Sequence, residues 1–346
     1  MDRKPSTLVT MRISASQLAR LETRCDVKQA GWGLTGIRLS EDELIQALDG
    51  VEILMAGYEK ITAGVIQQAP VLKLIAIARG NPANLDYQAA SKKDIPVLYA
   101  PGRNAIAAAE FTMGVILSQA RHIAKSDRTL RSGIYTGKPM QNFTDASQDQ
   151  DVIWDLDGDN PYTAFCGVEL HGKCLGLIGL GQVASRVASL AGAFGMQVYA
   201  YSPKSNPEFA KSLNVELVDE ETLLRNSDFI SVHCRVTAET RGMLDAHAFS
   251  LMKPTCHLIN TARAIIIDQA ALMNALKDYQ IAGAALDVYW YEPLPSNHPL
   301  LALENLTVTP HLAGATMEVI ERHSRMLVDD VFAWLDGQTP AHIFSP

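Results

Sequence analysis

The chain has 346 residues, more than one ordinary domain holds and enough for two domains with sizeable cores. Hydrophobic residues make up 47% of it and charged residues 20%, as in a soluble globular enzyme and unlike a disordered chain. The net charge is −8 and no block of lysines and arginines is present, which argues against nucleic acid or an anionic membrane surface as a partner.

The five cysteines are scattered, and no two of them form a C-x-x-C pair. This pattern argues against a disulfide framework and a structural zinc site, so no metal is expected. The amino-terminal stretch MDRKPSTLVTMRIS lacks the apolar core of a signal peptide, and no later run approaches ~18 apolar residues. We therefore expect a cytoplasmic protein without a membrane span.

Short apolar runs alternate along the chain with segments whose apolar residues recur every three or four positions. Helical spacing is clearest at 41–48, 183–193 and 268–276. This alternation predicts an α/β protein with parallel sheets. In chain order, the predicted strands are 51–57, 72–78, 95–100, 173–180, 196–201, 229–234, 257–260, 283–289 and 306–310.

Residues 135–170 interrupt this alternation, because they are polar and rich in Asp, Asn, Gln and Gly. Within them, DLDGDN at 155–160 resembles the start of a calcium loop. Its glycine falls at position four instead of six, and position twelve is Cys166 instead of a glutamate. We interpret 135–170 as a long acidic surface excursion that covers the active site or contacts a second subunit.

The strongest local signal is CLGLIGLGQVASRVASLAGAFGMQVYAYS at 174–202, in which a strand, a glycine turn, an amphipathic helix and a second strand follow one another. Gly179 allows the tight turn, Gly181 lets the backbone approach a pyrophosphate, and Ala184 packs the helix on the strand. The pyrophosphate would lie at the helix N-terminus, where free N–H groups favour negative charge. The segment therefore predicts a dinucleotide site.

Three candidate catalytic side chains follow predicted strands farther along the chain. Arg263 lies in NTARAIIID, Glu292 in ALDVYWYEPLP and His311 in TPHLAGAT. Ligands of an open parallel sheet bind at the carboxyl ends of its strands, so we expect the three side chains to meet there. Arg263 would clamp a substrate carboxylate, and His311 would exchange a proton with the substrate hydroxyl. Glu292 would hold the other ring nitrogen and favour its charged form.

These motifs resemble those of the NAD-dependent D-isomer-specific 2-hydroxyacid dehydrogenases. The glycine motif, N-T-x-R, L-D-V…E-P and P-H…T occur in the family's order and at its spacing, and the resemblance covers about residues 50–335. It implies that Arg263, Glu292 and His311 form the catalytic set. It also implies hydride transfer between NAD(H) and a D-2-hydroxy acid/2-oxo acid pair, with NADP as a possible alternative cofactor.

The resemblance further implies two Rossmann-like, doubly wound parallel-sheet domains with the active site in the cleft between them. Residues 1–105 and 318–346 would form the substrate domain, and 106–317 the NAD-binding domain that carries the excursion. The segment 101–123 resembles the family's interdomain crossing and long helix, which implies a homodimer.

The resemblance also assigns ligand contacts. RGNPANLD resembles the loop whose backbone amides bind the substrate carboxylate, which makes Arg79, Gly80 and Asn81 substrate-binding candidates. The candidate cofactor contacts are Gly179, Gly181, Gln182, Val183, Ser202, Cys234, Thr261, Ala262, Asp287 and Gly314.

The chain departs from the family pattern at Ser202, where an acidic residue is usual, at Ala264, where glycine is usual, and at Arg235, where proline is usual. A carboxylate at the end of the second strand would bind both ribose hydroxyls and repel a 2′-phosphate. Ser202 does neither strongly, and Lys204 brings a positive charge close in sequence. We expect NAD(H) to be used and NADP(H) to be tolerated.

Other functions remain open. A D-3-phosphoglycerate dehydrogenase-like enzyme needs cations for the phosphate, and MAGYEKI offers only Lys60 near the matching loop. A non-enzymatic, dinucleotide-sensing binding protein of the same fold could retain the three catalytic side chains. Formate-type chemistry would normally place Gln at Glu292. The sequence does not identify which 2-hydroxy acid is the substrate.

Overall fold

The computed structural model describes residues 3–136 and 160–345. The chain divides into two compact units, the first made of residues 1–107 and 314–346 and the second of residues 108–313. The centre of the predicted excursion, with nearly all of the DLDGDN motif, lies outside the described residues. The role expected for it as a cover or a subunit contact therefore stays a prediction.

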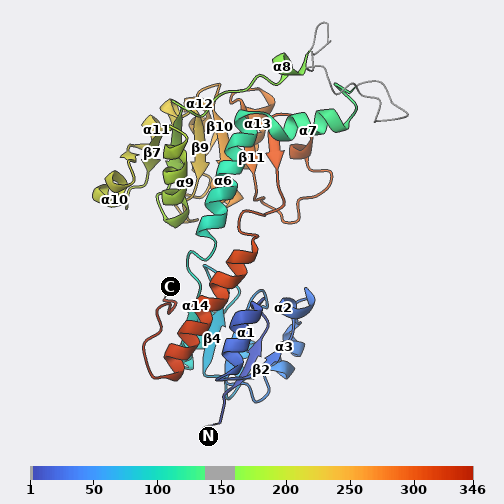
Figure 1. The fold of residues 1–346 in the computed structure, drawn as a ribbon, viewed down its shortest axis with the longest axis vertical. Helices are drawn as coiled ribbons and strands as arrows, with labels where there is room; N and C mark the ends of the chain where they lie inside the picture. Colours follow the sequence, from blue (N-terminus) through green and yellow to red (C-terminus); the bar gives the residue numbers. More distant parts are fainter. Residues whose placement is uncertain (1–2, 137–159, 346) are drawn as a thin grey trace, which may run out of the picture. The chain divides into compact units, whose positions relative to one another are not determined.

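The first unit contains a five-stranded parallel sheet (Figure 1). Its strands are β1 (Ser6–Val9), β2 (Asp26–Gln29), β3 (Ile53–Ala56), β4 (Leu74–Ile77) and β5 (Val97–Tyr99). Their spatial order is β2-β1-β3-β4-β5, and every neighbouring pair is parallel. The chain thus begins inside the sheet and winds to one edge and then to the other, which is a doubly wound order. The sequence analysis does not predict β1 and β2.

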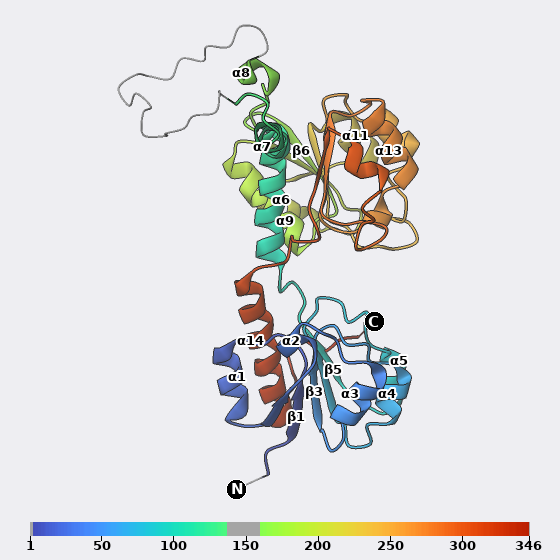
Figure 2. The same ribbon diagram turned by 90° about the vertical axis from the view of Figure 1, so that its right-hand side faces the viewer.

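Helices cover both faces of this sheet. They are α1 (Ala15–Glu22), α2 (Trp32–Thr35), α3 (Glu41–Ala47), α4 (Ala63–Gln67), α5 (Tyr87–Lys92) and α14 (Met317–Leu335). Figure 2 shows α1 and α14 on one face and α3, α4 and α5 on the other. Successive strand residues point to opposite faces, so Leu8 joins the core under α3 and α4 whereas Val9 joins the core under α1 and α14.

The second unit contains a seven-stranded sheet. Its strands are β6 (Cys174–Ile178), β7 (Gln197–Tyr201), β8 (Glu216–Leu217), β9 (Phe229–Val232), β10 (His257–Asn260), β11 (Gly283–Leu286) and β12 (Leu306–Val308). The spatial order is β12-β11-β10-β9-β6-β7-β8, with every pair parallel. The winding direction reverses at β6, which lies between β7 and β9, so the ligand crevice is expected beside the end of β6.

The larger sheet also has helices on both faces. The helices along this part of the chain are α6 (Ala105–Ala120), α7 (Ile123–Arg131), α8 (Pro161–Ala164), α9 (Gln182–Ala193), α10 (Pro207–Ser212), α11 (Glu220–Asn226), α12 (Ala246–Leu251), α13 (Gln269–Lys277) and the 3-10 turns η2 (Ala264–Ile266) and η3 (Pro299–Ala302). Figure 2 shows α6 and α9 on one face and α11 and α13 on the other. Each face has its own buried cluster, around Leu177 and Val187 on the first and around Leu258 and Leu272 on the second.

Polar side chains at loop ends explain where many helices begin. Ser40 accepts a hydrogen bond from the Glu43 backbone N–H, and the Glu43 carboxylate accepts one from the Ser40 backbone, which closes a capping box at α3. Asp268 caps α13 and Thr316 caps α14, each by accepting a hydrogen bond from a backbone N–H in the first turn. The predicted α/β class with two doubly wound parallel sheets is confirmed. Across the described residues, no helix combines the length and the hydropathy that a membrane crossing needs.

Candidate active site

The carboxyl ends of the second unit's strands carry most of the residues singled out in the sequence. Gly179 follows β6, Ser202 follows β7, Cys234 follows β9, and Thr261 and Arg263 follow β10. Two further strands, β11 and β12, lead into the segments that contain Asp287 and Glu292 and that contain His311, respectively. Because all seven strands are parallel, these residues lie at one edge of one sheet.

The turn after β6 fits the pyrophosphate of a dinucleotide. Gly179 has a φ of +94°, and a Cβ atom there would lie 2.9 Å from the backbone nitrogen of Cys234, so only glycine fits. Gly181 is the N-cap of α9 and makes no side-chain capping hydrogen bond. A Cβ atom on Gly181 would meet nothing within 4 Å, so there is open space in front of the helix N-terminus. The first N–H groups of α9, at Gln182 and Val183, can therefore donate to an anion.

The end of β7, where a ribose would bind, has no carboxylate. The Ser205 hydroxyl donates to the Ser202 hydroxyl over 2.7 Å, and the Ser205 N–H donates to the Ser202 carbonyl over 2.9 Å. Burial lowers the pKa of His233, after β9, to about 4 and raises the pKa of the Cys234 thiol to about 11, so both are uncharged at neutral pH. The exposed Lys204 is the charged side chain of this turn.

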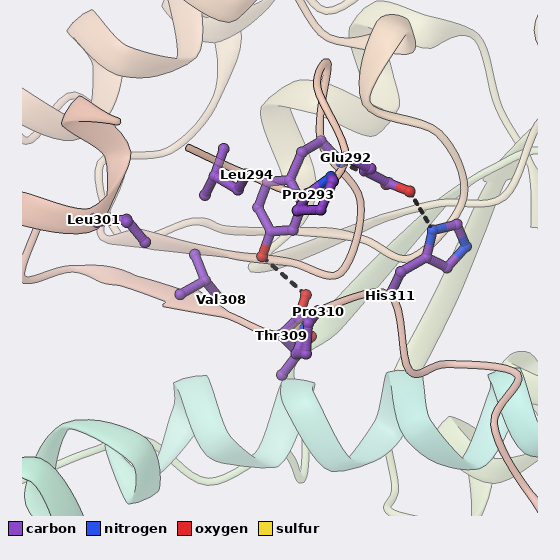
Figure 3. Close-up of a pocket in the computed structure, with 9 residues that line it drawn as sticks. Glu292, Pro293, Leu294, Leu301, Val308, Thr309, Pro310 and His311 are labelled. Atoms are coloured by element: carbon purple, nitrogen blue, oxygen red, sulfur yellow. Dashed lines mark hydrogen bonds and ion pairs between the residues drawn. The ribbon is translucent and has the colours of Figure 1, made fainter. Parts of the chain in front are cut away.

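His311 and Glu292 form a directly bonded pair. The Nδ1 atom of His311 lies 2.8 Å from Oε2 of Glu292, and the backbone N–H of Tyr289 donates to the other carboxylate oxygen over 3.0 Å (Figure 3). The carboxylate can only accept, so Nδ1 carries a proton in this contact. No described residue hydrogen-bonds to Nε2 of His311, which leaves that nitrogen free to give or take a proton.

Asp287 anchors the loop that carries His311. It is 1% exposed, and its Oδ1 accepts from the Thr309 hydroxyl and the Leu312 N–H, both over 2.7 Å. Its Oδ2 accepts from the Ala313 N–H over 2.8 Å. These bonds hold the chain on both sides of His311, whose φ is +60°. The sequence pattern predicts Asp287 only as a cofactor contact and gives no sign of this anchoring role.

Asn260 performs a similar task for Arg263. It is fully buried, and its side-chain amide donates to the Arg263 carbonyl and accepts from the Ala262 N–H, each over 2.9 Å. The Thr261 hydroxyl lies 3.0 Å from that of Thr112 on α6. The Arg263 side chain is exposed, and its Nη1 donates to the Ala262 carbonyl over 2.6 Å. Among the described residues, no hydrogen bond or ion pair joins Arg263 to Glu292 or His311.

A cavity of about 610 Å³ opens beside the histidine–glutamate pair (Figure 3). Its wall is largely apolar, with Leu294, Leu301 and Val308 opposite the two polar side chains. The Tyr289 hydroxyl donates to the Thr309 carbonyl over 2.9 Å, and burial raises its pKa to about 12, so this hydroxyl stays neutral.

The remaining candidates belong to the first unit. Arg79, Gly80 and Asn81 follow β4, and Gly314 precedes α14. Gly80 and Asn81 are exposed, whereas Arg79 is half-buried. A Cβ atom on Gly314 would lie 2.8 Å from Nδ2 of Asn104, so this glycine permits a close contact within its own unit. No cluster of three or more His, Cys, Asp or Glu suited to a metal occurs among the described residues.

The fold and the site together indicate a class of protein: a dinucleotide-binding oxidoreductase with an acid–base histidine at the carboxyl edge of its cofactor sheet. Residues 113–313 match the family model described as D-isomer specific 2-hydroxyacid dehydrogenase, NAD binding domain. The glyoxylate reductase of Thermofilum pendens is 34% identical over 97% of this chain and 93% of its own. The chain therefore belongs to the D-isomer-specific 2-hydroxyacid dehydrogenase family.

Two further relatives widen the comparison. The D-3-phosphoglycerate dehydrogenase of Archaeoglobus fulgidus is 37% identical over 86% of this chain, which covers 52% of that protein. The solved structure of an acyclic imino acid reductase in complex with NADPH and D-Arg has a TM-score of 0.78 at 25% identity, covering 98% of this chain and 100% of that one. The family resemblance, the NAD(P) cofactor and the reaction class, hydride transfer between that cofactor and a 2-hydroxy acid/2-oxo acid pair, are confirmed.

Proposed function

We propose that the enzyme reduces a 2-oxo acid to its D-2-hydroxy acid with Arg263, Glu292 and His311 as the catalytic set. The observation that carries this assignment is the 2.8 Å contact between His311 and Glu292 at the sheet edge that also holds the glycine turn. A bound reduced nicotinamide supplies the hydride. The loop at Arg79 to Asn81 would contribute to the carboxylate site of the substrate.

In this proposal each side chain has one task. Arg263 binds the substrate carboxylate with two parallel N–H groups, which fixes the orientation of the 2-oxo group. Nε2 of the His311 imidazolium donates its proton to the keto oxygen as the adjacent carbon is reduced. After this transfer, Nδ1 of His311 keeps its own proton, which it donates to the Glu292 carboxylate. Because the imidazole is half-exposed, solvent can return a proton to Nε2.

The reaction is tested by measuring the oxidation of NADH and NADPH with a panel of 2-oxo acids and by determining the configuration of the product. We expect D-2-hydroxy acids and a higher kcat/KM with NADH. The turn after β7 has no carboxylate, so we expect NADPH to be tolerated. Ser202 cannot repel a phosphate, and one exposed lysine contributes little binding energy in water. A preference for NADPH above about tenfold, ~1.4 kcal/mol, would overturn the cofactor choice. Absence of any oxidation would favour the dinucleotide-sensing function.

Replacing Glu292 with glutamine tests the proton-transfer pair. The amide keeps a hydrogen-bonding group near Nδ1 but removes the charge that favours the imidazolium. We expect a smaller loss of kcat than for removal of His311, because the amide oxygen can still hold the ring while the negative charge beside it is lost. Steady-state kcat of Glu292→Gln and His311→Ala checks this order, and a wild-type rate for Glu292→Gln would count against the pairing.

We further infer a homodimer in the cytoplasm. The amphipathic α7 exposes Ile123 and Leu130, which suits an interface better than free solvent. All five cysteines are free, and Cys166 is exposed, as suits a reducing compartment. Sedimentation equilibrium that gives the mass of one chain at micromolar concentration would contradict the dimer.

A further inference from the structure

A small polar cavity lies in the second unit at the sheet edge opposite the candidate active site. Its volume is about 120 Å³, and its lining includes His257 at the start of β10, Ala282 just before β11 and Asn305 just before β12. Because the strands are parallel, this is the amino edge of the sheet, whereas the candidate catalytic side chains follow the carboxyl ends. The end of α6 and the helix α7 form the other side of the cavity.

Hydrogen bonds within the protein fix the floor of this cavity. The side-chain nitrogen of Gln119, on α6, donates to the Ala284 carbonyl and to the Thr307 hydroxyl, each over 2.8 Å. The side-chain oxygen of Gln119 lies 3.2 Å from Nδ1 of His257, and because an amide oxygen can only accept, Nδ1 carries a proton. Burial lowers the pKa of His257 to about 4, so the ring is neutral and Nε2 presents a lone pair.

Close packing keeps the His257 ring in this orientation. The ring stacks on that of Phe229, with the centroids 5.4 Å apart and the planes 15° apart. A Cβ atom on Gly283 would lie 2.6 Å from the Asn305 carbonyl oxygen and 3.2 Å from Nδ1 of His257, so glycine is needed beside the ring. Among the described residues, no hydrogen bond reaches Nε2 of His257. The floor therefore offers a ligand one fixed acceptor.

Two cations of α7 also line the cavity. Lys125 and Arg128 are one helical turn apart, and both are exposed. The Lys125 ammonium lies 3.9 Å from the Glu304 carboxylate, a long ion pair between exposed groups that contributes little in water. No ion pair within residues 3–136 and 160–345 includes Arg128. Two cations against one carboxylate leave the lining positive.

The helix α7 is weakly anchored to the rest of the second unit. None of its residues is buried, and it begins after His122, whose φ is +53°. Tyr279, which lines the cavity together with His122, has the same φ. Left-handed backbone conformations of residues other than glycine are uncommon and gather at ligand sites. Burial and then the charge of Lys125 lower the pKa of His122, so this imidazole is neutral as well.

We propose that the cavity binds inorganic phosphate, which bridges α7 and the amino edge of the sheet. The phosphate oxygens would accept hydrogen bonds from Lys125 and Arg128, and the P–OH group would donate to Nε2 of His257 or to the Glu304 carboxylate. The cavity volume corresponds to about four water molecules at ~30 Å³ each, which suits an ion of this size. The site is separate from the proposed reaction, because none of its residues belongs to the candidate active site.

The acceptors in the lining distinguish phosphate from other oxyanions. Monohydrogen phosphate keeps one O–H group at neutral pH, whereas sulfate, carboxylates and phosphomonoester dianions have none. Those ions would place oxygen acceptors against the lone pair of His257 and the carboxylate of Glu304. A site built to accept a hydrogen bond strongly rejects an analogue that lacks the donor. We therefore expect a preference for phosphate over sulfate, and not a general attraction of anions.

The two cations and the apolar residues assigned to the subunit interface lie on different sides of α7. Successive residues of an α-helix are about 100° apart around its axis, so Lys125 and Arg128 lie on the side opposite to Ile123 and Leu130. Dimer formation through Ile123 and Leu130 therefore leaves the two cations able to bind an anion.

The test measures phosphate binding to the NADH-bound enzyme, in which the pyrophosphate of the dinucleotide occupies the N-terminus of α9. Isothermal titration calorimetry near neutral pH and at constant ionic strength compares phosphate with sulfate. We expect phosphate to bind at least about tenfold more tightly than sulfate. Arg128→Met should weaken phosphate binding by about tenfold or more, because it removes a charge-assisted hydrogen bond.

Arg131→Met is the matched control for this variant. It makes the same change of charge on the same helix, but Arg131 does not line the cavity and forms an exposed ion pair with Asp127. Its affinity for phosphate should stay within about twofold of the wild type, since an exposed ion pair contributes little. A loss equal to that of Arg128→Met would overturn the proposal, because phosphate would then respond only to the net charge of α7.

Hydrogen exchange locates the bound ion. Phosphate should slow exchange of the backbone amides of residues 124–131 in the wild type and not in Arg128→Met, since the ion ties α7 to the sheet. Undetectable phosphate binding, equal affinities for phosphate and sulfate, or unchanged exchange in α7 would each overturn the proposal. None of these measurements requires turnover, so a failure of the proposed reaction leaves the result intact.

Discussion

Replacing His311 with alanine is expected to lower kcat by roughly 10²–10⁴-fold, the range that a positioned general acid supplies. Affinity for the dinucleotide should be nearly unchanged, because the glycine turn and the N-terminus of α9 do not contain His311. The fold should survive as well, since Asp287 holds the His311 loop through Thr309, Leu312 and Ala313 and not through the imidazole. Steady-state rates and fluorescence titration with NADH measure the two effects separately.

Two further variants make this result specific. His311 has a φ of +60°, a conformation that asparagine adopts more readily than alanine, so His311→Asn removes the acid with less backbone strain. It should be as inactive as the alanine variant. His247, which is exposed on α12, provides the control, and His247→Ala should behave like the wild type. Turnover by either His311 variant near the wild-type rate would show that another group donates the proton.

Much of the cofactor domain can be predicted because its strands are short apolar runs that end at recognisable turns. The prediction fails where local pattern and tertiary role differ. The run at 283–289 reads as one strand, but β11 ends at Leu286, and the Asp287 side chain that follows binds the backbone of the loop after β12. The edge strand β2 escapes prediction because DVKQ is mostly exposed and carries no apolar alternation.

In the candidate site, too, the sequence predicts what local pattern determines and misses what tertiary contacts determine. Motif spacing brings Glu292 and His311 to one sheet edge, and their contact follows from the topology. The anchoring bonds of Asn260 and Asp287 join side chains to backbone groups, which leave no mark in a pattern of residue types.

Replacing Arg263 with lysine is expected to reduce kcat/KM for every 2-oxo acid by about 10²-fold or more. The guanidinium offers two parallel donors to a carboxylate, whereas an ammonium offers a point charge on a flexible stem. Asn260 fixes the backbone on both sides of Arg263, so the lysine variant should keep the turn and lose only the fork. Because lysine keeps the positive charge and lacks the two parallel donors, this variant measures the contribution of the donor geometry alone.

The pattern across substrates decides what Arg263 binds. A loss shared by all the 2-oxo acids tested locates Arg263 at the carboxylate that they have in common. Arg235→Lys, an exposed substitution after β9, serves as the control and should change kcat/KM by less than about twofold. Near-normal efficiency of Arg263→Lys would mean that the loop at Arg79 to Asn81 alone holds the carboxylate. Partial recovery of Arg263→Ala by free guanidinium would, by contrast, tie the lost activity to the missing fork itself.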